Sequence, residues 1–190
     1  MPDILEARIL VVGEAGSGKT SLIQRFVNNS FSDVYEPTIG CVINERYYNV
    51  ESMENQFHVY VWDTCGNSAY SALNHLYYKG SSCAIIVVES NKPESVCGER
   101  IKNFLQTIRE QCGSIPVLIV KTKSDELQTS LSWTQTTSYA PGVPIVSVSA
   151  KNDTNVAHAF KLLLNELVRH QQLVGVRVDV PVHRLRDIAS

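Results

Sequence analysis

Near its N-terminus the chain carries Gly13-Glu14-Ala15-Gly16-Ser17-Gly18-Lys19-Thr20, which satisfies the pattern G-x-x-x-x-G-K-[ST] at every fixed position. The apolar run 9–12 before it predicts a buried strand, and the helical spacing of apolar residues over 21–27 predicts a helix after it. Backbone N–H groups and the dipole at a helix N-terminus both favour negative charge. The pattern therefore predicts a phosphate-binding loop, the alternative being a chance match in a Gly/Ser-rich turn.

Two side chains of this loop have specific predicted roles. Lys19 would reach the β- and γ-phosphates of a nucleotide, and the Thr20 hydroxyl would ligate Mg²⁺. The residues that we expect to surround the phosphates are Gly13, Ala15, Gly16, Ser17, Gly18, Lys19, Thr20 and Ser21.

Composition indicates one soluble globular domain and excludes several classes of protein. The chain has 190 residues, of which 44% are hydrophobic and 19% charged, enough for a single core. Its formal charge of −2 argues against a nucleic-acid partner. It has no run of 18 apolar residues and no secretory signal at its start. The five cysteines lack paired spacing, which favours free thiols in the cytoplasm.

Strand-like and helix-like segments alternate along the chain. This alternation predicts an α/β domain in which a mostly parallel sheet is covered on both faces. Polar residues interrupt the second and third strands, so we expect these two to form an edge hairpin. The predicted strands lie near 7–12, 41–50, 56–62, 83–89, 115–121 and 143–148, and the predicted helices near 19–28, 68–79, 93–112, 131–139 and 153–174.

Two downstream segments carry candidate Mg²⁺ ligands. Thr38 lies in the polar loop 35–40, where its hydroxyl can reach Mg²⁺ and its N–H a γ-phosphate, so that a triphosphate would order the loop. Asp63 ends a predicted strand and would hold the Mg²⁺ shell, although a helix N-cap is the alternative role. Gly66 would offer its N–H to the γ-phosphate with no side chain in the way.

Two later segments carry candidate base contacts. Thr122, Lys123 and Asp125 follow the fifth predicted strand, and a carboxylate there can accept two donors from a guanine edge, which adenine cannot match. The stem of Lys123 can lie over the base. The segment Ser149-Ala150-Lys151 follows the sixth strand and would offer a backbone N–H to the guanine carbonyl, although small residues after a strand are common.

These segments occur in order at the carboxyl ends of predicted strands, where open α/β sheets bind ligands. Together they resemble the Ras-like small GTPases, and FSDVYEPTIG (31–40), WDTCG (62–66) and YYKG (77–80) resemble the Rab branch most. The resemblance covers about residues 5–170. It implies the three-layer P-loop NTPase fold: a six-stranded, mostly parallel sheet with one antiparallel edge strand and about five flanking helices.

The resemblance also implies ligands and partners. GTP or GDP would bind with Mg²⁺ on Thr20, Thr38 and Asp63, while Phe31 would stack edge-on to the guanine. Effector proteins would dock around Thr38–Gly40 and Asp63–Tyr78. An exchange factor and an activating protein are further partners that the resemblance implies. Ile39, Trp62 and Tyr78 would lie on or under that effector surface. The catalytic candidates are Asn67, Lys19 and Thr38.

Three of the chain's departures from the family affect the expected function directly. Asn67 stands where most relatives have the Gln that orients the attacking water, and its shorter side chain predicts slow hydrolysis. The guanine motif begins with Thr122 instead of the commoner Asn, a replacement that Rho-like relatives tolerate at this position. No cysteine follows Cys112, so with Ser190 as the natural end membrane contact would be only indirect. We expect a nucleotide-binding domain over 1–174 and a Val-rich tail over 175–190, either flexible or docked.

The leading expectation is a Rab-like GTP/GDP switch that recruits effectors in membrane or ciliary trafficking. It would be cytoplasmic and reach organelle membranes through partners. Three features leave an alternative open: Asn67, the replacement of the usual Arg and Phe of the second switch by Ser68-Ala69-Tyr70, and the missing anchor. In this alternative the protein holds GTP permanently and serves as a structural subunit of a complex. A P-loop kinase would need an Arg-rich lid, and no such segment occurs.

Overall fold

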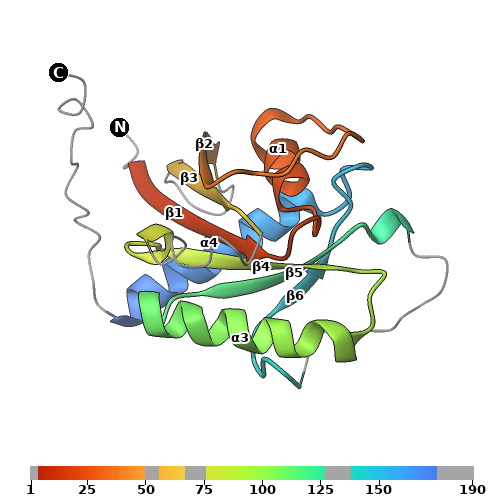
Figure 1. Cartoon of the computed structure of the whole chain (residues 1–190). Coiled ribbons are helices and arrows are strands. Elements are labelled where there is room, and N and C mark those ends of the chain that lie inside the picture. The colour runs from red at the N-terminus through yellow and green to blue at the C-terminus, as the bar shows by residue number, and fades with distance from the viewer. Residues whose placement is uncertain (1–3, 50–55, 67–75, 127–137, 175–190) are drawn as a thin grey trace.

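The computed structural model describes residues 4–49, 56–66, 76–126 and 138–174 (Figure 1). Its strands agree with the predicted ones to within a few residues. The predicted helices at 68–79 and 131–139 fall mostly outside the described residues. The elements are β1 (Ile4–Gly13), α1 (Lys19–Asn28), β2 (Cys41–Asn49), β3 (Gln56–Thr64), β4 (Cys83–Glu89), α3 (Glu94–Cys112), β5 (Val117–Thr122), a 3₁₀ turn (Ser124–Glu126), β6 (Ile145–Ser147) and α4 (Val156–Val174).

The strands form one six-stranded sheet in the order β2-β3-β1-β4-β5-β6. Only β2 runs antiparallel, pairing with β3 at the sheet edge as predicted, and every other pair is parallel. The runs in β1, β4 and β5 are almost continuously apolar because helices cover both of their faces. The β2 strand, by contrast, is mostly exposed.

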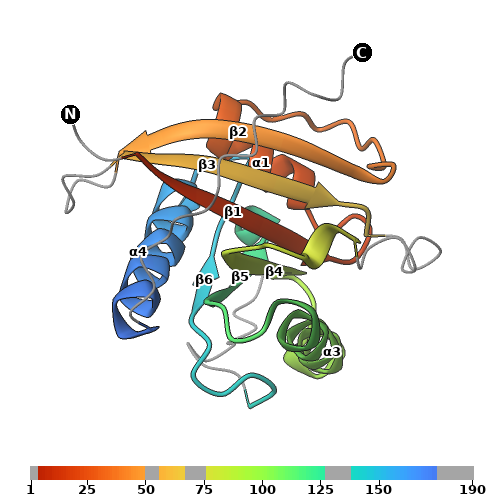
Figure 2. The same cartoon turned by 90° about the vertical axis from the view of Figure 1, so that its left-hand side faces the viewer.

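The helices lie in two layers, one on each face of the sheet (Figures 1 and 2). One face packs against α1 and α4, where the rings of Phe26 and Phe160 stack with centroids 3.7 Å apart. The other face packs against α3 through Ile101, Leu105 and Ile108. The three-layer α/β fold is therefore confirmed.

Two element boundaries near the C-terminus differ from the prediction. The sixth strand spans only Ile145–Ser147, and the last helix begins at Val156 rather than near 153. The reason is a small closed loop, in which the backbones of Ser149 and Thr154 exchange two hydrogen bonds of 2.9 and 3.0 Å. The loop carries the predicted base contacts Ser149, Ala150 and Lys151. Because its backbone pairs with itself, the helix begins only after Thr154.

Parallel strands bring their carboxyl ends to a common edge of the sheet. Register places Val11 of β1 beside Asp63 of β3, and Gly13 beside Val87 of β4. The phosphate loop, Asp63 and the segment after β5 therefore meet at one edge, as expected for a ligand site in an open α/β sheet. In the described part of the chain, none of the helices has both the length and the hydropathy needed to cross a bilayer.

Candidate nucleotide-binding site

The phosphate loop joins the end of β1 to the start of α1. Gly18, the residue before the helix, has φ of 88°, a conformation that glycine adopts without strain. The N-cap residue Gly18 has no side chain that could accept a hydrogen bond from the first N–H groups of α1. The Lys19 Nζ donates to the carbonyls of Gly13 (3.0 Å) and Glu14 (2.7 Å), which holds the ammonium against the loop.

Lys19 is a buried cation beside an anion site. Burial lowers its pKa below the ordinary value, and the neighbouring Asp63 carboxylate opposes that shift. A phosphate group would supply further compensating negative charge to the ammonium. The geometry therefore suits the role predicted for Lys19.

Three oxygen-bearing side chains from different parts of the chain converge beside this loop. Thr20 Oγ1 donates to Asp63 Oδ2 at 2.6 Å and lies 2.9 Å from Thr38 Oγ1. Thr38 Oγ1 is 3.4 Å from the same carboxylate oxygen. The helix α1, the loop before β2 and the strand β3 thus each contribute one predicted Mg²⁺ ligand.

The Asp63 carboxylate fits a divalent cation on independent grounds. Its Oδ1 is buried without a hydrogen-bond partner among the described residues. Burial raises the pKa of Asp63, while hydrogen bonds from Thr20 and Thr38 and the charge of Lys19 pull it down. An unpaired buried carboxylate oxygen is costly, and a hard cation such as Mg²⁺ prefers oxygen ligands. The described residues hold no cluster of three or more His, Cys, Asp or Glu side chains suited to a metal.

The segment after Asp63 lies directly against the phosphate loop. Ala15 N–H donates to the Gly66 carbonyl at 3.1 Å. A Cβ at Gly66 would lie 2.4 Å from the Ala15 nitrogen and 2.6 Å from Lys19 Nζ, distances that no side chain can occupy. Glycine is therefore required here for the close approach of the two backbones.

Thr122 connects the base side of the site to the phosphate side. Its Oγ1 donates to the carbonyl of Ser17 at 2.6 Å and lies 3.1 Å from that of Val88. The side chain is buried under the loop, so the role that the structure gives it is to hold the loop in place. A hydroxyl at this position makes the connection, which explains how Thr serves where relatives more often carry Asn.

The two predicted base-reading segments are held together. Ser149 Oγ donates to Asp125 Oδ1 at 2.6 Å, and Ser124 N–H donates to the Val148 carbonyl at 3.1 Å. Arg25 of α1 donates from Nε to the carbonyl of Ala150 at 2.7 Å, which fixes the orientation of that peptide. The Asp125 carboxylate and the Ala150 backbone are therefore placed together by contacts from three elements.

This arrangement can be compared with known families. The sequence profile of the Ras family matches residues 8–169, most of the chain. The chain belongs to the Ras family. Its order of motifs along the sheet edge is the one that this family resemblance implied.

Curated Ras-family relatives further define the branch. The chain is 31% identical to Ras-related protein RabC of Dictyostelium discoideum over 165 residues, covering 84% of this chain and 83% of that protein. It is 32% identical to Ras-related protein RABF2b of Arabidopsis thaliana over 171 residues, covering 88% and 84%. It is 32% identical to GTP-binding protein YPTM2 of Zea mays over 157 residues, covering 80% and 75%. The chain is a Ras-like small GTPase of the Rab branch.

The predicted effector surface of this Ras-family member is apolar and exposed. Ile39 is 80% exposed, whereas Tyr78 is buried, so one lies on the surface and the other beneath it. Trp62, the third residue predicted for this surface, has the Arg8 guanidinium 3.6 Å from the centroid of its ring. Other exposed large apolar side chains lie in the loop before β2 (Val34 and Tyr35), in β2 (Val42, Ile43 and Tyr47) and in the segment before β4 (Leu76).

The other predicted site residues stand as follows. Ser21 lies in the first turn of α1, and Phe31 is half-buried in the loop that follows this helix. Lys151 Nζ pairs with Asp33 Oδ1 at 2.9 Å, which joins the base-side loop to that same loop. Asn67 and the tail 175–190 lie outside the described residues, so their roles stay predictions.

Sequence reasoning missed four residues that shape the site. They support it through contacts between segments far apart in the chain, and no short motif signals such a contact. Arg100, for example, forms an ion pair with Glu14 across 86 residues of sequence. The four are Glu14, Arg25, Glu89 and Arg100.

Proposed function

We propose that this protein is a Rab-like molecular switch that binds GTP or GDP with Mg²⁺. The observation that carries the proposal is the meeting of Thr20, Thr38 and Asp63 beside a phosphate loop. Two of these residues belong to regular elements, whereas Thr38 belongs to an exposed loop. A ligand that needs all three oxygens would therefore control the position of that loop.

The proposed cycle uses the chain's own groups as follows. Thr20 and Asp63, which are hydrogen-bonded to each other, would hold the cation, and the buried Lys19 and the backbone of the phosphate loop would bind the phosphates. The cation, when bound, neutralises charge on the β- and γ-oxygens. Thr38 and Gly66 contribute only where a γ-phosphate is present, so the loop with Ile39 is ordered by the triphosphate and released by the diphosphate.

Base selection is assigned to the opposite side of the site. The Asp125 carboxylate would accept two donors from guanine, the Lys123 stem would cover the base, and the Ala150 N–H would donate to the guanine carbonyl. The contacts from Ser149 and Arg25 support this assignment, because they orient those groups before a ligand arrives. Phe31 would close the edge of the base.

The proposed output is effector recruitment in membrane or ciliary trafficking. The exposed apolar side chains around Ile39 lie beside the loop that Thr38 would order, so their arrangement would report the bound nucleotide. An exchange factor and an activating protein would act on the predicted effector segments around Thr38–Gly40 and Asp63–Tyr78. The protein would be cytoplasmic and reach organelle membranes through partners. The nucleotide-binding domain would span 1–174.

Competition binding tests the nucleotide assignment. A fluorescent GDP is displaced from the full chain by GDP, GTP or ATP, with Mg²⁺ and again with a chelator. We expect GDP and GTP to compete at least a hundredfold better than ATP, because a site built to hydrogen-bond guanine leaves polar groups unpaired against adenine. We also expect the chelator to weaken binding. Equal competition by ATP would contradict a guanine switch.

Hydrolysis tests whether the switch cycles. Single-turnover GTP hydrolysis with Mg²⁺ is compared between the natural chain and Asn67→Gln. We expect the Gln variant to be faster, by up to about a hundredfold, since a misplacement of about 1 Å can cost that much. Equal rates would show that Asn67 already positions water adequately. No hydrolysis by either protein would instead favour a permanently GTP-bound subunit.

A further inference from the structure

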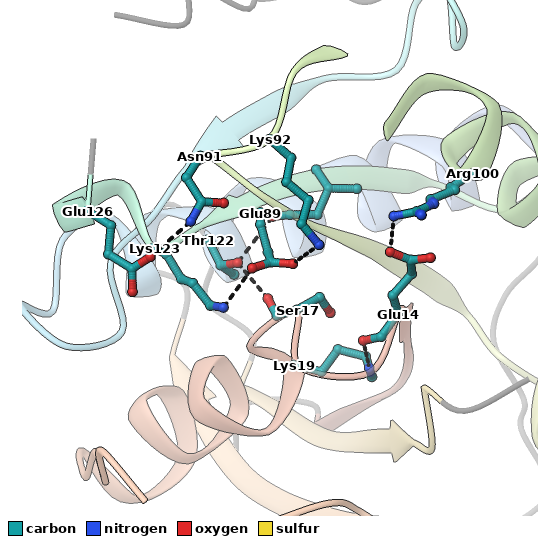
Figure 3. Close-up of polar contacts among 11 residues, drawn as sticks. Glu14, Ser17, Lys19, Glu89, Asn91, Lys92, Arg100, Thr122, Lys123 and Glu126 are labelled. Atoms are coloured by element: carbon teal, nitrogen blue, oxygen red, sulfur yellow. Dashed lines mark hydrogen bonds and ion pairs between the residues drawn. The ribbon is translucent and has the colours of Figure 1, made fainter. Parts of the chain in front are cut away.

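Glu89 is a largely buried carboxylate at the edge of the candidate site, and none of the ligand contacts proposed above uses it. It is the last residue of β4 and pairs in register with Thr122, the last residue of β5. Its side chain is only 11% exposed. Figure 3 shows it between the segment after β5 and the segment after β4, beside the phosphate loop.

Two lysines share this carboxylate. Oε2 of Glu89 lies 2.7 Å from Nζ of Lys123, and Oε1 lies 2.5 Å from Nζ of Lys92 (Figure 3). Burial would raise the pKa of Glu89, but the hydrogen bonds and charges of the two lysines outweigh it and hold the pKa below its ordinary value. The group is therefore an anion at neutral pH, and each oxygen has its own cation.

Of the two lysines, Lys123 is the one with a predicted ligand contact. Its backbone has φ of 57°, in the left-handed region, so the chain turns sharply at this residue. The side chain of Lys123 remains 32% exposed and has four rotatable bonds. Ordering such a side chain costs about 1.5–2 kcal/mol of conformational entropy. A contact that orders it beforehand removes that cost from ligand binding.

We propose that Glu89 is a positioning residue for base recognition, which holds Lys123 in the orientation from which its stem covers the guanine. The proposal rests on the proposed function, because it deepens the base side of the same site. Glu89 acts through Lys123 and does not itself meet the nucleotide. Since it acts on the base side, it affects GDP and GTP equally.

The experiment is the affinity of Glu89→Gln for GDP and for GTP, measured with Mg²⁺ on the full chain. The amide keeps the shape of the side chain and removes its charge. We expect both affinities to fall by about three- to tenfold, the range for loss of one partly exposed ion pair plus its ordering. The ratio of the two affinities stays unchanged. Loss of GTP affinity alone would place the effect on the phosphate side and overturn the proposal.

A second pair of variants separates positioning from general stabilisation. Lys92→Met removes the other cation of Glu89 and leaves the Lys123 contact in place, so we expect GDP affinity within twofold of the natural chain. In a Lys123→Met background we expect Glu89→Gln to cause no further loss, because the residue through which it acts is gone. An additional loss in that background, or an equal loss in Lys92→Met, would assign Glu89 a purely structural role.

A conservative variant covers the case in which Glu89→Gln does not fold. Glu89→Asp keeps the charge on a side chain one methylene shorter, and we expect a loss of affinity smaller than the loss of about three- to tenfold expected for the Gln variant. An affinity as high as that of the natural chain for every folded Glu89 variant would overturn the positioning role while leaving the guanine switch intact. A natural chain that binds ATP as well as GDP would instead overturn the proposed function.

Discussion

At the scale of single residues, the site depends on hydroxyls that connect separate segments. Thr122 reaches the carbonyl of Ser17, and Ser149 reaches the carboxylate of Asp125. Each contact is short and is made by a mostly buried donor, so it fixes the position of a group that the ligand would meet. The identity of these two residues thus matters through the geometry that they impose on their neighbours.

Asp125→Asn tests base reading at this scale. An amide presents a donor where the carboxylate presents an acceptor, so we expect GDP affinity to fall by roughly a hundredfold or more. We also expect xanthosine diphosphate, whose edge offers an acceptor there, to bind better than GDP. Competition against a fluorescent nucleotide measures both values.

The matched control is Asp153→Asn, the same change at an exposed carboxylate in the loop after β6. It should leave the affinities for both diphosphates unchanged. Retention of guanine preference by Asp125→Asn would remove this residue from the base contact.

At the scale of elements, α3 is held close to the segment before β6. A Cβ at Gly98, in the second turn of this helix, would lie 2.3 Å from the ring of Tyr139. The helix therefore keeps a glycine at a position where glycine lowers helix propensity, and the ring occupies the space that a side chain would need. Arg100 of the same helix forms an ion pair with Glu14 of the phosphate loop, so the position of α3 affects the position of that loop.

Gly98→Ala tests this packing, because its sign depends on Tyr139. In the natural chain we expect destabilisation of about 1–3 kcal/mol, the usual cost of overpacking. In a Tyr139→Ala background we expect the same change to stabilise by up to about 1 kcal/mol, since alanine is the better helix former. Urea unfolding of the four proteins measures both effects. Stabilisation in both backgrounds would show that the ring yields freely.

At the scale of the whole molecule, one sheet serves both stability and function. Its faces are covered by α1 and α4 on one side and α3 on the other, and its carboxyl edge carries the candidate site. A ligand bound at that edge as we propose would contact segments that follow β1, β3, β5 and β6, which span most of the described chain. Binding should therefore stabilise the whole domain rather than one part.

Thermal unfolding with ligand tests this coupling. At a free GDP concentration of 100 times Kd, linkage adds about 2.7 kcal/mol to the free energy of unfolding. For a domain of this size that raises Tm by about 5–11 °C, at about 2–4 °C for each kcal/mol. Scanning calorimetry with Mg²⁺ measures the shift. ATP at the same concentration should raise Tm by no more than about 1–2 °C, because it binds at least a hundredfold more weakly, and a chelator should reduce the shift with GDP.

Much of the fold and the order of the site residues followed from local patterns. Periodicity located the described strands, and the phosphate loop, Thr38, Asp63 and Asp125 were identified from short motifs beside them. The boundaries of β6 and α4 differ from the predicted ones by a few residues. The helix α4 begins later because hydrogen bonds between Ser149 and Thr154, rather than residue propensity, shape the segment before it.

The sequence by itself determined the family, the sheet and the edge at which the motifs meet, because periodicity and motif spacing are local properties of the chain. The tertiary structure alone decided which side chains support those motifs. Glu89 with Lys123, Arg25 with Ala150 and Arg100 with Glu14 are pairs separated by 34 to 125 residues. Such pairs arise from strand register and from the packing of helices on the sheet, and both are set only when distant segments come together.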